Sequence, residues 1–135
     1  MEAPEGFEAL EEASSFIETV GPVYLNSTRG SLPVLGVRIA SHHANRRGRA
    51  HGGLLTTLAD TAMSRAVVTQ LPPGATMSTA DLHIAFLDAA GDGQWVEATP
   101  SLDRVGRALI HGSCQLTADG KPVAQALGCF AVRLG

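Results

Sequence analysis

The sequence is poor in the residues on which several classes of protein depend. Its 135 residues include two cysteines, one tryptophan and one tyrosine, and 17% of them are charged. The cysteines match no metal-binding spacing, so we expect no metal site. The net charge of −3 provides no general basic surface, so we expect no nucleic-acid partner.

A leader and a membrane-spanning run are missing as well. The sequence begins MEAPEGFEALEEASS, which is acidic and lacks the basic and apolar regions of a secretory signal. No apolar run approaches the ~20 residues that cross a bilayer. These absences predict a cytoplasmic protein without a membrane partner.

The low charge content also bears on assembly. Soluble domains usually carry about 25% charged residues, and this chain falls below that share. A small domain with few charges often hides surface in a subunit interface, although a well-buried monomer fits the same numbers. The length fits one domain over residues 1–135.

The order of the expected elements indicates an α+β fold. We predict a short amphipathic helix at about 6–19, a strand at about 33–41 and a long helix at about 52–69, which LPPGA ends. Strand-like runs fill the remainder. One long apolar helix followed by an antiparallel meander suggests a sheet curled around that helix. The uncovered side of the sheet and its edges then need water or a second subunit.

The last two strand-like runs form a predicted hairpin at Asp119-Gly120, a favoured turn pair. That turn pairs residue 114 with 125, so Cys114 and Cys129 do not lie opposite each other. We expect two free thiols without a catalytic role.

The long helix contains a carboxylate that needs an explanation. Between Gly53 and Val68 the only charged residues are Asp60 and Arg65. A desolvated carboxylate is costly, so Asp60 must be hydrogen-bonded, protonated or near water. It is either a functional group or a partly exposed side chain paired with Arg65.

The helix begins with His51-Gly52-Gly53, which suits a reactive site. Backbone N–H groups of the first turn lack partners within the helix, and the helix dipole is positive there. Glycine lets a ligand approach closely, so a developing oxyanion fits this turn. The simpler interpretation is a tight loop-to-helix transition with His51 as a cap.

The spacing of His51 and Asp60 limits how they can cooperate. They lie about 13–14 Å apart along the helix axis and about half a turn around it, so they cannot meet on one helix. A shared site requires two subunits, or a substrate that bridges a long path.

The segment NRRGRAHGGLLTTLADTAMSRAV is similar to the N-x-x-G-x-x-H-G-G-(x)6-D signature of hotdog-fold acyl-CoA thioesterases. The phenylacetate-pathway type, within the 4-hydroxybenzoyl-CoA thioesterase superfamily, is the subfamily it resembles most. STADLHIAFLDAA and DRVGRALIHGSCQLTADGKPVAQALGCF resemble two further parts of that pattern. The matching positions of the signature are Asn45, Gly48, His51, Gly52, Gly53 and Asp60.

The resemblance implies a hotdog fold, in which a curved antiparallel sheet wraps one long central helix. It also implies a homodimer or homotetramer with active sites between subunits. Asp60 would act as general base or nucleophile, and the backbone N–H of Gly52 or Gly53 would bind the oxyanion. Asn45 and His51 would come from the opposite subunit.

The remaining site positions follow from the same resemblance. Thr79 matches a residue that holds the nucleophilic water. Arg104 and Arg107, which flank Val105-Gly106, fall where similar proteins hold CoA. Arg46 and Arg47 are weaker candidates for phosphate contacts.

Thr79 conflicts with the expected strand. Side chains along a strand point alternately to its two faces. Leu82, Ile84 and Phe86 are assigned to the face toward the helix, so Thr79 falls on the opposite face. A local bulge, or an approach from the dimer side, is required.

His42 and His43 resemble half of a metal site. No carboxylate or cysteine accompanies them, so we expect exposed loop histidines.

The resemblance implies an acyl-CoA thioesterase that releases a free acid and CoA, with no cofactor besides the CoA of its substrate. One alternative is a non-catalytic acyl-CoA-binding protein. Another is a hydratase or dehydratase, which needs a histidine paired with an acid in a different motif. The acyl group stays open between aryl-acetyl and short-to-medium aliphatic. Candidates for lining its pocket are Leu54, Leu55, Leu58 and Met63.

Overall fold

The computed structural model describes residues 3–11 and 13–135. These residues form a single antiparallel sheet, two α-helices and one turn of 3-10 helix. In chain order these elements are β1 (Glu8–Ala9), α1 (Ser15–Val20), β2 (Val23–Asn26), β3 (Val34–Arg38), η1 (Ser41–His43), α2 (Gly52–Val68), β4 (Thr76–Phe86), β5 (Trp95–Val105), β6 (Leu109–Ala118) and β7 (Lys121–Arg133).

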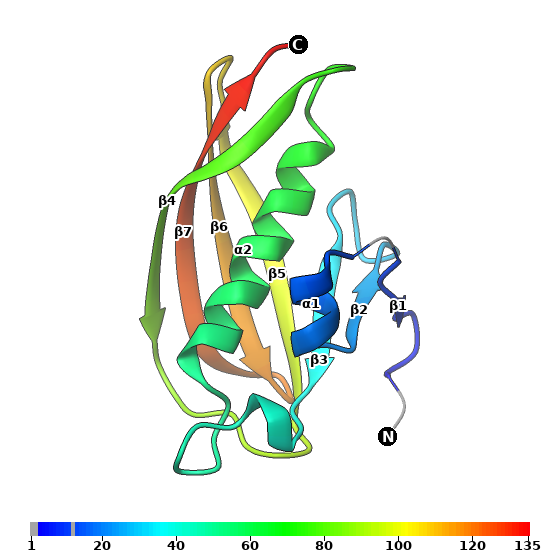
Figure 1. Ribbon diagram of the computed structural model, residues 1–135, viewed down its shortest axis with the longest axis vertical. Helices are drawn as coiled ribbons and strands as arrows, with labels where there is room; N and C mark the ends of the chain where they lie inside the picture. Colours follow the sequence, from blue (N-terminus) through cyan, green and yellow to red (C-terminus); the bar gives the residue numbers. More distant parts are fainter. Residues whose placement is uncertain (1–2, 12) are drawn as a thin grey trace.

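The sheet curves around the long helix, as the sequence predicts. Its strand order is β1-β2-β3-β5-β6-β7-β4, and every neighbouring pair is antiparallel. Figure 1 shows the four long strands bending along α2, which lies across one face. The long strand β4 is therefore at one edge of the sheet and the short strand β1 is at the other.

Helix α2 supplies the centre of the core. Its buried residues recur three or four positions apart, which places them on the side that faces the sheet. They are Leu54, Leu55, Leu58, Ala59, Ala62, Met63, Ala66 and Val67. The four residues predicted to line an acyl pocket, Leu54, Leu55, Leu58 and Met63, are at most 7% exposed and pack in the core. Leu54 and Leu58 also line a small apolar hollow beside α1, so for these two the prediction stays a prediction.

The helix predicted over residues 6–19 is much shorter in the structure. Of the described residues in this stretch, the helical ones belong to α1, Ser15–Val20, and the Ser14 side chain caps this helix by accepting from the N–H of Ile17 at 3.2 Å. Residues 8 and 9 pair with β2 instead. Phe7 explains the difference, since its ring packs edge-on against Trp95 of β5, with 5.0 Å between ring centroids. That tertiary contact outweighs the local helical pattern.

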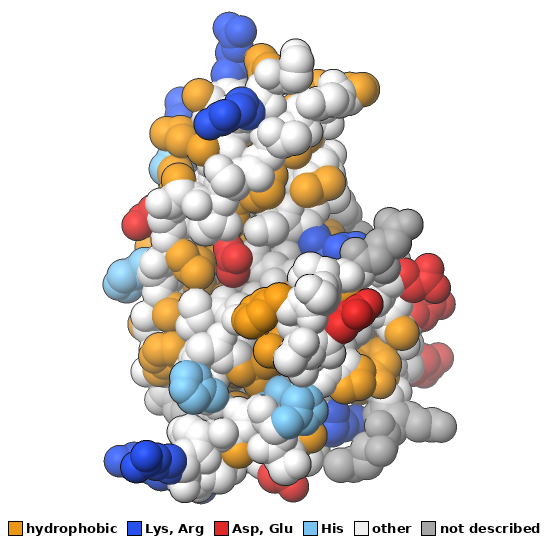
Figure 2. Space-filling model, viewed as in Figure 1, with side chains coloured by type: hydrophobic (Ala, Val, Ile, Leu, Met, Phe, Trp, Pro, Cys, Tyr) orange, Lys and Arg blue, Asp and Glu red, His pale blue; other side chains and the backbone are white. Residues whose placement is uncertain are grey.

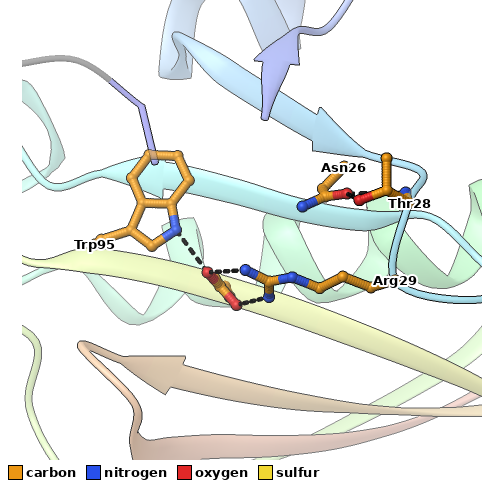
Figure 3. A network of polar contacts seen from close by, with 5 residues as sticks. Asn26, Thr28, Arg29 and Trp95 are labelled. Atoms are coloured by element: carbon orange, nitrogen blue, oxygen red, sulfur yellow. Dashed lines mark hydrogen bonds and ion pairs between the residues drawn. The ribbon is translucent and has the colours of Figure 1, made fainter. Parts of the chain in front are cut away.

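A polar and aromatic cluster fixes this early segment to the sheet. Trp95 Nε1 donates to Glu97 at 2.9 Å, and Arg29 forms an ion pair with the same carboxylate (Figure 3). The Arg29 guanidinium also lies 5.1 Å from the centroid of the Phe7 ring. We call Phe7, Arg29, Trp95 and Glu97 the N-terminal anchor.

The hairpin turn is where the sequence predicts it, but the register beyond the turn differs by one residue. Asp119 and Gly120 both have positive φ, and Ala118 pairs with Lys121. Farther from the turn, a register shift between Leu116 and Thr117 pairs residue 114 with 126 rather than with 125. Pro122 has no N–H to offer a regular ladder, which favours an irregularity at this point.

The two cysteines behave as predicted. Both are free thiols, and they do not pair with each other across the hairpin. Burial raises the pKa of Cys114 to about 12, so this thiol stays protonated near neutral pH and is a poor nucleophile.

The expectation of exposed loop histidines is wrong for His43. Its side chain is 3% exposed and fully hydrogen-bonded. Nε2 donates to the carbonyl of Val20 at the end of α1, and Nδ1 accepts from the N–H of Ala40 at 2.9 Å. His42 is exposed, as expected, and contacts the carbonyl of Gly21. Of the described residues, no group of three or more His, Cys, Asp or Glu side chains could hold a metal ion.

Helix α2 is the longest helix in the described part of the chain. It has 17 residues and includes Asp60 and Arg65. No helix within the described part of the chain is long and apolar enough to cross a membrane.

Candidate functional site

Asp60 lies halfway along α2, on the side of the helix next to β4. Its side chain is half-buried, and its Oδ1 accepts a hydrogen bond of 2.8 Å from Thr79 Oγ1. This bond uses one oxygen of the carboxylate, and among the described residues no group other than the Thr79 hydroxyl forms a hydrogen bond with the Asp60 side chain. The second oxygen is therefore available to a water molecule or a substrate.

A β-bulge resolves the conflict over Thr79. The pairing of β4 with β7 shifts between Thr79 and Asp81, so Ala80 is an extra residue without a partner. An extra residue reverses which side chains face the core on the two sides of the bulge. Met77 and Thr79 thus face the helix before it, and Leu82 and Ile84 face the helix after it. The bulge anticipated from the sequence is present, and it brings Thr79 to Asp60.

Asp60 opens onto a cavity of about 410 Å³ between α2 and the segment that carries α1. The wall from the early segment is mostly apolar. The wall from α2 is mostly polar and includes Thr57, Thr61, Ser64 and Arg65 besides Asp60. Sequence reasoning missed this cavity, because it depends on Leu10 and residues 13–17 folding over α2. The signal available in the sequence was the unusual share of threonine and serine in an otherwise apolar helix.

Arg65 is not the ion-pair partner of Asp60. The structure has no salt bridge between them, although both side chains line the same cavity. The simpler interpretation of Asp60 is therefore correct in that the carboxylate is partly exposed, and wrong in pairing it with Arg65.

The turn at His51 fits both interpretations drawn from the sequence, a capped start of the helix and a site for an oxyanion. His51 is the N-cap of α2, and its Nδ1 accepts from the N–H of Gly53 at 2.8 Å. A Cβ at position 53 would lie 2.9 Å from that nitrogen, so the cap requires glycine there. The N–H groups of Leu54 and Leu55 donate to the His51 carbonyl. Within the described residues, the N–H of Gly52 is the first-turn donor without an acceptor.

Asn45 organises the loop that precedes the helix. Its Oδ1 accepts from the N–H groups of Arg47 and Arg49, at 2.8 and 3.1 Å. The same loop lines a second, more open hollow of about 500 Å³, together with His51 and the side chains of Arg46 and Arg47. Four of the predicted site residues, Asn45, Arg46, Arg47 and His51, therefore lie together at this hollow. Asp60 lines the other cavity.

The other predicted arginines lie at the opposite end of the molecule. Arg104 belongs to the end of β5, and Gly106 and Arg107 form the turn into β6. Both arginines are exposed. Figure 1 places this turn beside the C-terminal end of α2, whereas the Arg46-Arg47 loop is beside its N-terminal end. Figure 2 accordingly shows basic side chains at the top and at the lower left. One protomer therefore cannot bring both arginine pairs to one ligand.

Comparison with known proteins identifies the family. A family model described as the thioesterase superfamily matches residues 47–124. The chain is 34% identical over 130 residues to a putative esterase of Pseudomonas aeruginosa, an alignment that covers 96% of this chain and 97% of that one. It is 28% identical over 123 residues to human acyl-coenzyme A thioesterase 13, with coverage of 90% and 87%.

A solved structure extends the likeness to three dimensions. A Bacillus halodurans protein crystallised with CoA superposes with a TM-score of 0.71 at 32% identity. The alignment covers 74% of this chain and 66% of that one. The resemblance inferred from the sequence motifs is confirmed at the level of family and fold.

Proposed function

Because this chain belongs to the thioesterase superfamily, we propose that it hydrolyses an acyl-CoA thioester to a free acid and CoA. Its human relative is named an acyl-CoA thioesterase, and the Bacillus halodurans protein was solved with CoA. The observation that carries the proposal is the Asp60–Thr79 hydrogen bond at the edge of a cavity large enough for an acyl group. The cytoplasmic location expected from the sequence belongs to the same proposal.

Asp60 is proposed as the group that activates water. Thr79 fixes one carboxylate oxygen, and the other accepts a proton while the water oxygen attacks the thioester carbonyl carbon. The tetrahedral intermediate then expels the CoA thiolate, which takes up a proton, and the acid is released. Direct attack by the Asp60 oxygen is the alternative, and it requires a mixed anhydride that water later hydrolyses.

Gly52 is the better of the two candidate oxyanion donors. The N–H of Gly53 already donates to His51, whereas the N–H of Gly52 has no acceptor within the described residues and lies at the positive end of α2. We propose that the Gly52 N–H binds the carbonyl oxygen as it becomes negative.

The site is proposed to be shared between two chains. Strand β4 has 11 residues and is the edge strand next to β7, and a long unpaired edge favours pairing with a second copy. The ring of Phe86, at one end of β4, lies beside Gly52. Antiparallel pairing of two β4 strands about their middle residue, Asp81, would place the partner's Phe86, and with it the partner's Gly52, opposite Thr76, three residues along β4 from Thr79 of this chain.

The same arrangement brings the basic groups together. Two chains related in this way run α2 in opposite directions, so Arg104 and Arg107 of one chain approach the end that carries Arg46 and Arg47 of the other. We propose that CoA binds across this junction, with its phosphates near these arginines. The minimal unit is then a homodimer, which a homotetramer would contain twice.

The test is release of free thiol from a panel of acyl-CoAs by the wild type and by Asp60→Asn. We expect the substitution to lower kcat by at least about 100-fold, because it removes the base or nucleophile. Asp92→Asn is the matched control, since Asp92 is exposed in a loop away from the cavity, and it should behave as the wild type.

Other outcomes separate the alternatives. Near-normal activity of Asp60→Asn would contradict the mechanism. Binding of acyl-CoA without release of thiol by the wild type would favour a non-catalytic binding protein. Loss of enoyl-CoA absorbance without release of thiol would favour a hydratase.

A further inference from the structure

Arg65 is a charged residue of the cavity that the proposed chemistry does not use. It lies on α2, is half-buried and lines the 410 Å³ cavity together with Asp60. No carboxylate among the described residues forms a salt bridge with it. Removing a guanidinium from water without a partner is unfavourable, so a half-buried arginine facing a cavity is suited to an anionic ligand.

The helix places Arg65 and Asp60 at opposite edges of the cavity. Five positions separate them, which corresponds to about 7.5 Å along the axis and about 140° around it. Thr57, Thr61 and Ser64 lie between these two directions and face the cavity as well. A ligand whose reacting carbon is beside Asp60 must therefore cross this polar strip before it reaches Arg65.

The opposite wall fits an aliphatic chain. Leu10, Phe16 and Ile17, from the segment over α2, provide most of its apolar surface. Phe16 is 59% exposed in the protomer, although it lines the cavity, so a bound chain would cover part of its ring. The cavity thus offers apolar contact along one side and a cation at the end away from Asp60.

We propose that Arg65 selects acyl-CoA substrates whose acyl chain ends in a carboxylate. This inference rests on the proposed function, because it assumes that the thioester carbonyl is beside Asp60. The guanidinium of Arg65 would donate two hydrogen bonds to the terminal carboxylate, a geometry that arginine matches well. The methylene groups of the chain would lie against Leu10, Phe16 and Ile17.

The phosphates of CoA are a less suitable partner for Arg65. The early segment contributes mostly apolar residues to this cavity, whereas phosphates favour open, polar surroundings with several cations. The exposed arginines at the two ends of the molecule provide such surroundings. The acyl half of the substrate is therefore the half assigned to this cavity.

The experiment compares two substrates that differ only at the far end of the acyl chain. Values of kcat/KM are measured for octanoyl-CoA and for suberyl-CoA, the eight-carbon chain with a terminal carboxylate. We expect the wild type to prefer suberyl-CoA. Arg65→Met should lower the ratio of suberyl-CoA to octanoyl-CoA by roughly 10- to 100-fold, the effect of losing charge-assisted hydrogen bonds. Arg65→Lys should give an intermediate ratio, because lysine keeps the positive charge but cannot donate two parallel hydrogen bonds to the carboxylate.

The control variant is Arg133→Met, which removes an exposed arginine outside the cavity and should leave the ratio as in the wild type. If Arg65→Met does not fold, competitive inhibition of the wild type by suberate and by octanoate replaces it, and suberate should bind more tightly.

Each contrary result identifies what has failed. Hydrolysis of octanoyl-CoA without a preference for suberyl-CoA, or weaker binding of suberate than of octanoate, overturns the role of Arg65 and leaves the thioesterase proposal standing. An equal loss with both substrates in Arg65→Met indicates a contact with CoA and overturns the role as well. No hydrolysis of any acyl-CoA by the wild type overturns both proposals.

Discussion

At the scale of single residues, the hydrogen bond from Thr79 to Asp60 defines how the carboxylate can act. The bond holds one oxygen in place and so orients the other toward the cavity. A carboxylate without this restraint samples several rotamers, and only some of them suit proton transfer. Thr79 is therefore a positioning residue in the proposed mechanism.

Replacing Thr79 with valine keeps the shape of the side chain and removes its hydroxyl. We expect kcat to fall by about 10-fold, in line with the loss of one hydrogen bond to a charged group. Thr79→Ser keeps the hydroxyl and should retain most of the activity. Equal losses in the two variants would show that packing, and not the hydroxyl, is what matters at this position.

His43 makes stability depend on pH. Burial lowers the pKa of this histidine below its ordinary value of about 6.5. Between the lowered pKa and 6.5 the unfolded chain takes up a proton that the folded protein does not, so acid favours unfolding. The free energy of unfolding should therefore fall as the pH decreases through about 6.5, and it should level off below the pKa of the folded state.

Urea titrations between pH 7.5 and 5 measure this dependence. His43→Gln should lower the free energy of unfolding by about 1–2 kcal/mol at pH 7.5, because at least one buried backbone group loses its partner. It should also weaken the dependence on pH. His111→Gln, at an exposed position of β6, serves as the control, and a similar change there would contradict the assignment.

At the scale of elements, the N-terminal anchor depends on a close approach between two strands. A Cβ on Gly36 of β3 would lie 2.2 Å from the Trp95 ring, so only glycine fits under the indole. Gly36→Ala should lower the free energy of unfolding by about 1–3 kcal/mol through overpacking. In the double variant Gly36→Ala with Trp95→Phe, the ring at position 95 is smaller. This variant should recover part of the lost free energy of unfolding, measured by thermal unfolding. Additive losses in the double variant would contradict the contact.

The elements that the sequence predicts well are those whose signals are local. Helix α2, the turn at Asp119-Gly120 and the need for a bulge near Thr79 follow from periodicity, turn chemistry and a conflict between strand faces. Of the candidate site, local reasoning singles out Asp60 and gives His51 as the helix cap, whereas Thr79 follows from the resemblance to thioesterases.

The features that the sequence does not reveal depend on contacts between distant segments. The early helix is short because Phe7 packs on Trp95, nearly ninety positions away, which no local pattern can show. His43 is buried because it reaches the end of α1. The proposed role of Arg65 emerges only when Leu10 and residues 13–17 lie over α2 and enclose a cavity.

At the scale of the whole molecule, the proposed shared site can be tested by mixing two inactive variants. Asp60→Asn and His51→Ala each damage one half of the site. In a mixed dimer that draws these groups from different chains, one of the two sites contains both native residues. Random pairing makes half of the dimers mixed, so co-refolding should restore about a quarter of the wild-type activity. Refolding each variant alone is the control, and no recovery on mixing would contradict a shared site.

The division of the cavity between two stretches of chain has an evolutionary consequence. Asp60 and Thr79 belong to helix α2 and strand β4, whereas the apolar wall belongs to Leu10, Ala13, Phe16 and Ile17. Mutations at these four positions can alter which acyl group fits without disturbing the reacting carboxylate. Duplicated genes for this protein can therefore diverge in substrate by changing a few codons for these residues, while the chemistry is inherited intact.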